Sequence, residues 1–212
     1  MRLDDLVRRA ESLASAGGRR VLGIVGPPGA GKSTLATILV ERLGDRARYV
    51  PMDGFHLANV ELVRLGRRQR KGAPDTFDGA GYVALLRRLR DPAEETVYAP
   101  TFRRDLEEPI AGAIPVPREV PLVVTEGNYL LLDTPPWSEI RHLLDDAWYL
   151  DPPEPERLDR LIRRHQRYGK SPEEARAWAL GSDQANAELV ATSRGRADLV
   201  LHGFDAVDAV TH

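Results

Sequence analysis

A short stretch near the N-terminus combines small residues, one lysine and one serine at a spacing suited to phosphate binding. Residues 26–33 read GPPGAGKS and fit the pattern GxxxxGK[ST] between an apolar run and an amphipathic segment. Glycines let successive backbone N–H groups turn toward an anion, and a helix start adds the positive end of its dipole. The predicted nucleotide-binding loop comprises Gly26, Pro27, Pro28, Gly29, Ala30, Gly31, Lys32, Ser33 and Thr34. We expect Lys32 to reach the β- and γ-phosphates and Ser33 to ligate Mg²⁺; an ordinary glycine-rich turn is the alternative.

Two acidic residues directly follow apolar runs that have the composition of buried strands. Asp53 comes after residues 47–52, and Glu126 comes after residues 122–125. Ligands of a doubly wound sheet collect at the carboxyl ends of its strands, so both acids could face the loop. Phosphoryl transfer to a hydroxyl needs a metal ion and a group that takes the hydroxyl proton. Asp53 suits the role of base and Glu126 that of metal ligand, although Asp53-Gly54 fits an ordinary turn equally well.

The elements that must position these residues alternate between strand and helix. Apolar residues at helical spacing predict helices over 3–14, from about 32 to 43, around 82–89, around 157–167 and from 172 to about 190. Short apolar runs predict strands at 21–25, 47–52, 122–125, 148–150 and 199–201. Short strands separated by helices are typical of a parallel sheet covered on both faces. The sequence therefore predicts an α/β fold with a doubly wound parallel sheet, in one domain over residues 1–212.

Composition excludes several classes of protein. Thirty basic residues are matched by thirty-two acidic ones, which argues against a nucleic-acid partner. There is no cysteine, so disulfides and thiolate chemistry are excluded. No apolar run approaches a membrane span, and the charged start does not fit a signal peptide. We expect a cytoplasmic protein with no membrane partner.

Four motifs taken together resemble one family of kinases. They are the loop at 26–34, MDGFH at 52–56, RKGAPDTFD at 70–78 and EGNYLL at 126–131. The assembly is similar to the phosphoribulokinase, uridine kinase and type I pantothenate kinase superfamily, and most like its bacterial nucleoside/nucleotide kinase-like group of fructose-transport-system kinases. The resemblance implies a P-loop NTPase fold with a helical lid and a small β flap, and ATP and Mg²⁺ as cofactors. It also implies Asp53 as general base, Glu126 as support for Mg²⁺, a small-molecule acceptor and a possible homodimer.

The same resemblance suggests where the acceptor binds. The segments are an insertion at about 54–78 and a proline-rich flap at about 97–119. The expected substrate-binding residues are Asp53, Phe55, His56, Asp75, Phe77, Arg104, Glu126, Asn128 and Tyr129. Asp78 could either contact substrate or cap the helix that contains Tyr82. The flap reads VYAPTFRRDLEEP and lacks the histidine of the uridine and pantothenate kinase segments, which weakens both of those assignments.

A cluster of basic residues resembles the lid of these kinases. The lid is expected at about 157–171, with Arg160, Arg163, Arg164, Arg167 and Lys170 as its cations. A closing lid requires cations that follow the migrating charge, and Arg163 is the first candidate. The alternative is a solvated helix face. Tyr168 stands where the family pattern has an arginine.

These observations predict an ATP- and Mg²⁺-dependent kinase that phosphorylates a hydroxyl of a small polar metabolite, sugar- or nucleoside-like. Lys32, Asp53 and Arg163 are the predicted catalytic residues. The alternatives are pantothenate or uridine as acceptor, or a regulatory ATPase that acts as a nucleotide-dependent switch.

Overall fold

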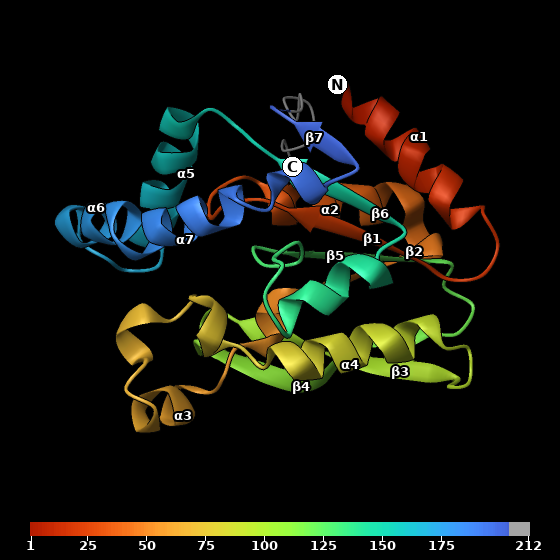
Figure 1. Ribbon diagram of the computed structural model, residues 1–212, viewed down its shortest axis with the longest axis horizontal. Coiled ribbons are helices and arrows are strands. Elements are labelled where there is room, and N and C mark those ends of the chain that lie inside the picture. The colour runs from red at the N-terminus through yellow and green to blue at the C-terminus, as the bar shows by residue number, and fades with distance from the viewer. Residues whose placement is uncertain (204–212) are drawn as a thin grey trace.

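The computed structural model describes residues 1–203. A parallel sheet of five strands forms its centre, in the order β2-β5-β1-β6-β7 (Figure 1). The strands are β1 (Arg20–Val25), β2 (Ala47–Pro51), β5 (Leu122–Gly127), β6 (Asp146–Leu150) and β7 (Leu199–Leu201). This confirms the expected α/β class with a parallel sheet.

The central strand β1 is apolar on both sides because the sheet is buried on both faces. One core contains Leu22 and Ile24 of β1 with residues of α1 (Leu3–Ala14) and α2 (Lys32–Leu43). The other contains the alternate residues Val21 and Val25, with α4 (Gly79–Arg90) and the flap. Side chains of a strand alternate between faces, so one apolar run serves two cores.

The flap is a two-stranded antiparallel hairpin of β3 (Thr96–Arg103) and β4 (Glu108–Pro117). It lies beside α4 on the lower side of the sheet in Figure 1. The insertion before α4 carries the short helix α3 (Asn59–Arg64) and single 3-10 turns. Asp78 is the N-cap of α4, where its side chain accepts a hydrogen bond from the backbone N–H of Gly81 at 2.8 Å. Of the two expected roles for Asp78, the structure supports capping.

Three helices follow β6 and pack together at one end of the molecule (Figure 1). They are α5 (Glu154–Arg167), α6 (Pro172–Leu180) and α7 (Ser182–Ala191). The prediction of a single helix from 172 to about 190 was wrong, because the helix is interrupted at Gly181. A Cβ at Gly181 would lie 2.8 Å from the carbonyl oxygen of Ala177, so the bend requires glycine.

Among the strand boundaries that differ from the prediction, two carry the acids. Strand β2 ends at Pro51, and Met52 begins a 3-10 turn that carries Asp53. Strand β5 continues through Glu126, whose partner in register is Pro51. Both acids nevertheless stand at the carboxyl ends of adjacent strands. Within residues 1–203, no helix has the length and apolar composition that crossing a membrane requires.

Candidate active site

The loop at residues 26–33 joins β1 to α2 through three glycines with positive φ. These are Gly26, Gly29 and Gly31, at φ values of 153°, 82° and 95°. A Cβ at Gly26 would lie 2.6 Å from the carbonyl oxygen of Leu150, and one at Gly29 would lie 2.8 Å from that of Arg157. No other residue fits at these two positions without displacing backbone. The α2 helix begins at Lys32, so its free N–H groups and its positive dipole end face the loop.

Lys32 is buried and points into the loop. Its Nζ donates to the carbonyl oxygens of Gly26 at 2.9 Å and Pro27 at 3.1 Å, and to Asn128 Oδ1 at 2.8 Å. Burial lowers the pKa of Lys32 to about 8, partly opposed by the charge of Glu126. An ammonium group held only by neutral oxygens is ready for an anionic partner.

Glu126 lies beside the hydroxyl of Ser33. The Ser33 Oγ donates to Glu126 Oε1 at 3.2 Å, and the Tyr49 hydroxyl donates to the same oxygen at 2.7 Å. Burial and the Asp53 charge raise the pKa of Glu126. Burial and Glu126 likewise raise the pKa of Tyr49, which therefore remains a hydrogen-bond donor. Sequence reasoning missed Tyr49, although it precedes Asp53 on the same strand and turn.

Asp53 faces the same space from the adjacent strand end. Its Oδ2 accepts a hydrogen bond from Arg104 Nη2 at 3.1 Å. Burial favours the neutral carboxyl, but the charges of His56 in its protonated form, of Arg104 and of Lys32 outweigh it and lower the pKa of Asp53. His56 Nδ1 donates to the backbone carbonyl of Asp53 at 2.8 Å, and burial lowers the pKa of His56. Asp53 is thus an ionised carboxylate held beside the loop.

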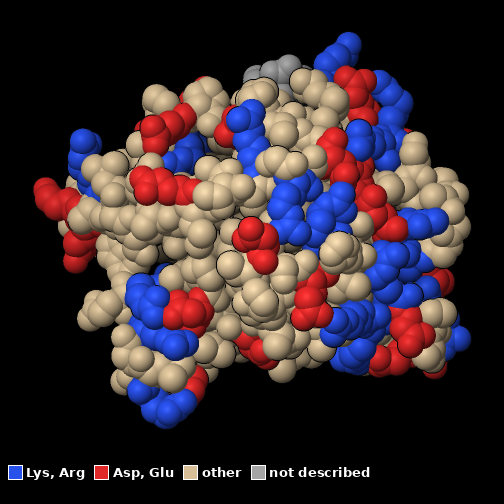
Figure 2. Space-filling model, in the orientation of Figure 1, with Lys and Arg blue, Asp and Glu red and all other residues tan. Residues whose placement is uncertain are grey.

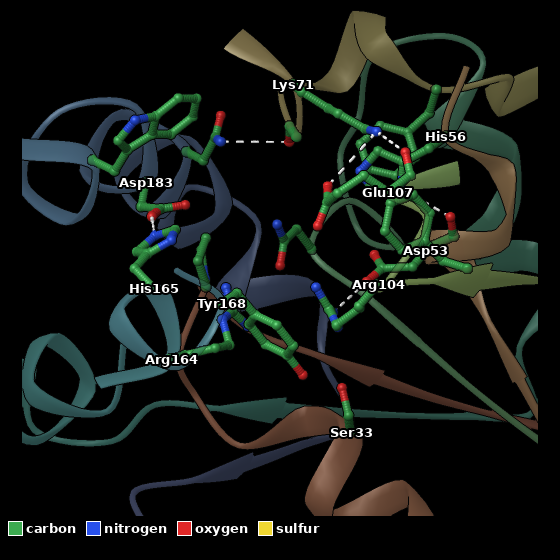
Figure 3. A pocket seen from close by; sticks show the side chains of 18 of the residues that line it. Ser33, Asp53, His56, Lys71, Arg104, Glu107, Arg164, His165, Tyr168 and Asp183 are labelled. Atoms are coloured by element: carbon green, nitrogen blue, oxygen red, sulfur yellow. Dashed lines mark hydrogen bonds and ion pairs between the residues drawn. The ribbon is translucent and has the colours of Figure 1, made fainter. Parts of the chain in front are cut away.

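These groups line one cavity of about 320 Å³. Figure 2 shows the molecule hollowed on its left side, between the helices α5–α7 and the segment around α3. In Figure 3, Ser33 lies at the base of the cavity, with Asp53 and Arg104 on one side and Arg164 and Tyr168 on the other. The predicted site residues in its lining are Pro28, Lys32, Ser33, Asp53, His56, Phe77, Arg104, Glu126, Asn128, Arg164 and Lys170.

Several predicted acceptor-site residues lie outside this lining. Phe55 packs on Tyr82, with ring centroids 5.1 Å apart. Asp75 forms ion pairs with Arg67 and Arg70. The buried Tyr129 donates its hydroxyl to the carbonyl oxygen of Gly72. These side chains support the fold of the insertion, because each is already engaged by neighbouring groups.

The predicted lid cations fall into two groups, one on the outer side of α5 and one facing the cavity. Arg163 pairs with Asp159 and Arg160 pairs with Glu156, along the exposed side of α5. Arg164, one position further along the helix, faces the cavity instead (Figure 3). Arg163, the first candidate, thus points away from the cavity and Arg164 lines it, because a one-residue step turns a helix by about 100°.

Arg157, which sequence reasoning grouped with the lid, supports the loop. Its side chain is buried, donates to the carbonyl oxygen of Pro28 at 3.3 Å and donates to Gln184 Oε1. A guanidinium in this position ties α5 and α7 to the phosphate loop.

The cavity also contains residues that were not among the predicted site residues. They are Arg68, Lys71, Phe102, Glu107, His165, Tyr168, Trp178, Asp183 and Asn186. His165 Nε2 donates to Asp183 Oδ2 at 2.6 Å, joining α5 to α7. Lys170 lies over the Trp178 ring, 4.6 Å from its centroid. Most of these residues lie in the expected insertion, flap and lid, whereas Trp178, Asp183 and Asn186 belong to α6 and α7, which no motif indicated.

A glycine loop at a helix start, a buried lysine and two carboxylates at adjacent strand ends together define a P-loop phosphotransferase. No protein-family model matches the chain. A protein of Schizosaccharomyces pombe named "putative uridine kinase" is 34% identical over 209 residues, which is 93% of this chain and 89% of that protein.

Solved structures of kinases are also similar to this chain. The crystal structure of a "putative fructose transport system kinase" from Silicibacter is 38% identical, with a TM-score of 0.86 over 95% of this chain and 99% of that one. YFH7 from Saccharomyces cerevisiae shares the fold at 17% identity, with a TM-score of 0.80 over 97% of this chain and 99% of that one. The chain belongs to the P-loop kinase superfamily that includes the uridine kinases, and it is an ATP-dependent small-molecule kinase.

Proposed function

We propose that the enzyme transfers the γ-phosphoryl group of ATP to a hydroxyl of a small polar metabolite, sugar- or nucleoside-like. The observation that carries this proposal is the shared cavity of Lys32, Ser33 and Asp53. It brings a phosphate-binding loop and an ionised carboxylate to one space, which extends outward between insertion, flap and lid. A kinase needs such room for a second substrate beside the terminal phosphate.

Asp53 is the proposed general base. The acceptor oxygen attacks the γ-phosphorus, and its proton passes to the Asp53 carboxylate. The bond from the γ-phosphorus to the bridging oxygen breaks, and ADP leaves. Lys32 and the loop N–H groups hold the β- and γ-phosphates, while Arg164 stabilises the charge on the transferring group.

The oxygens of Ser33 and Glu126 fit Mg²⁺. The described residues contain no cluster of three or more carboxylate or imidazole ligands. That suits Mg²⁺, which keeps several waters and takes few protein oxygens together with those of phosphates. When bound, the ion would neutralise phosphate charge. Tyr49 would orient the Glu126 carboxylate through its 2.7 Å hydrogen bond.

The substitution Asp53→Asn tests the proposal. The amide cannot accept the hydroxyl proton, so we expect phosphoryl transfer to fall by about 10²–10⁴-fold while ATP affinity is kept. Transfer is measured with a panel of sugars, nucleosides, pantothenate and glycerate, and ATP affinity by calorimetry. Asp75→Asn is the matched control, since Asp75 lies outside the cavity lining. Near wild-type transfer by Asp53→Asn would remove Asp53 as the base.

A further inference from the structure

Arg104 connects three functional segments at a single point. It is the first residue of the hairpin turn between β3 and β4, and its Nη2 lies 3.1 Å from Asp53 Oδ2. Its guanidinium carbon lies 5.9 Å from the ring centroid of Phe102 in the flap and 5.9 Å from that of Tyr168 in the lid. Figure 3 shows Arg104 and Tyr168 on the same cavity as Ser33. A planar guanidinium favours such contact with aromatic faces.

Arg104 shares its cavity with other cations. Lys32, Arg104 and Arg164 all line the same cavity. Burial, together with the charge of Arg104, lowers the pKa of Arg164. Within residues 1–203, Arg164 has no carboxylate at ion-pair distance, whereas its neighbour Arg163 pairs with Asp159. These three cations face three carboxylates, Asp53, Glu126 and Asp183, and Asp183 is already hydrogen-bonded to His165.

A polyanion entering the loop would relieve this repulsion. The three cations come from three different elements: Lys32 from α2, Arg164 from α5 and Arg104 from the flap. Groups converging from separate elements can surround the oxygens of a transferring phosphoryl group. Arg104 is also the cation that now pairs with the base, and a paired carboxylate is a weak proton acceptor.

We propose that Arg104 is a catalytic cation contributed by the flap. When ATP binds, the Arg104 side chain moves from Asp53 to the γ-phosphoryl group, and Tyr168 is its positioning residue. This rests on the proposed function, because it assigns Arg104 to the nucleotide rather than to the acceptor. The same movement frees the Asp53 carboxylate to take the acceptor proton. Nucleotide binding thus activates Asp53 as the base. The Arg104 guanidinium stays stacked on the Tyr168 ring as the lid closes. The bonds made and broken in phosphoryl transfer are unchanged.

The proposal is tested with ADP and aluminium fluoride, which together mimic the transferring phosphoryl group without any acceptor. Affinities for ADP alone and for ADP with aluminium fluoride are measured in the presence of Mg²⁺ on the wild type and on Arg104→Ala. We expect Arg104→Ala to bind ADP as the wild type does, but to lose about a hundredfold in affinity for the fluoride complex. Arg104→Gln repeats the test should the alanine variant not fold.

Arg103→Ala is the matched control. Arg103 is the preceding residue, is exposed, and pairs with Asp105 instead of facing the cavity. It should leave both affinities unchanged. Equal affinity of Arg104→Ala and wild type for the fluoride complex overturns the inference alone. A wild type that binds the fluoride complex no more tightly than ADP overturns the proposed function itself.

Tyr168 is tested through its ring. Tyr168→Phe keeps the aromatic face and should retain full affinity for the fluoride complex. Tyr168→Leu removes it and should lose about tenfold. In an Arg104→Ala background Tyr168→Leu should have no further effect, because a positioning residue acts only through the group that it holds. Additive losses in the double variant would contradict the assigned role of Tyr168.

Discussion

The two sides of the cavity are built in different ways. The phosphate side comes from one contiguous loop, and its geometry depends on backbone: three glycines with positive φ and a helix start. The opposite side, here called the acceptor side, takes side chains from the insertion, the flap, and the helices α5, α6 and α7. Of these side chains, Arg104 and Arg164 are the two proposed to act on the transferring phosphoryl group. In the proposed function, the first side binds a group common to all nucleoside triphosphates, whereas the second selects the acceptor.

This difference explains why the two sides respond differently to sequence change. A backbone cradle tolerates little variation, because a Cβ at Gly26 or Gly29 would meet a carbonyl oxygen. Side chains on hairpin turns and helix surfaces can be exchanged without rebuilding the sheet. We expect substitutions on the phosphate side to abolish activity with every acceptor, and those on the acceptor side to have graded effects.

The largest effect is expected from Lys32→Met. It removes the buried ammonium that meets the β- and γ-phosphates, so kcat/KM should fall by about a thousandfold with any acceptor. Steady-state kinetics with two chemically different acceptors checks this. If kcat/KM fell with only one of the two acceptors, the phosphate side would not act independently of the acceptor.

Arg164→Ala should have the next largest effect, a loss of about a hundredfold in kcat. Arg164 faces the cavity and makes no ion pair within the described part of the chain. Arg163→Ala is its control, since that side chain lies outside the cavity lining and pairs with Asp159. If Arg163→Ala lost more activity than Arg164→Ala, the lid would use the opposite side of α5 in catalysis.

Tyr49→Phe should have a smaller effect, limited to the metal requirement. Losing the hydroxyl that donates to Glu126 should raise the Mg²⁺ concentration for half-maximal activity by about tenfold, with little change at saturating Mg²⁺. A magnesium titration of initial rates measures it. An unchanged titration curve would remove Tyr49 from the metal site.

Asp78→Ala should affect stability and leave catalysis intact. Loss of the cap on α4 should cost about 1 kcal/mol, which lowers the melting temperature of a chain of this size by about 3 °C. Thermal unfolding and the KM for the acceptor are measured on the same preparation. A raised KM at an unchanged melting temperature would assign Asp78 to acceptor binding after all.

Much of the phosphate side could be predicted because its signals are local. Each predicted strand appears in the sheet, within one or two residues of the expected bounds, and the loop lies where GPPGAGKS placed it. Because Asp53 and Glu126 each follow an apolar run, the sequence also predicted that both could face the loop, and in the structure their strands β2 and β5 are neighbours. Helix boundaries were less predictable, because the break at Gly181 depends on a close backbone approach.

The acceptor side was predicted only in part. His56, Phe77 and Arg104 line the cavity, whereas Phe55 and Asp75 are engaged elsewhere. Motif position could not distinguish these outcomes, since adjacent residues such as Phe55 and His56 point in different directions. The pair of His165 and Asp183 had no sequence signal, because it depends on how α5 packs near α7.

The sequence by itself determined the alternation of strands and helices, the phosphate loop and the positions of the two acids directly after apolar runs. Periodicity and glycine positions suffice for these features because backbone geometry depends on a few neighbouring residues. Only the tertiary structure decided that Arg164 rather than Arg163 faces the cavity, and that Arg104 meets Asp53 and Tyr168. Those contacts join residues tens of positions apart, so they exist only once the flap and the lid have packed around the sheet.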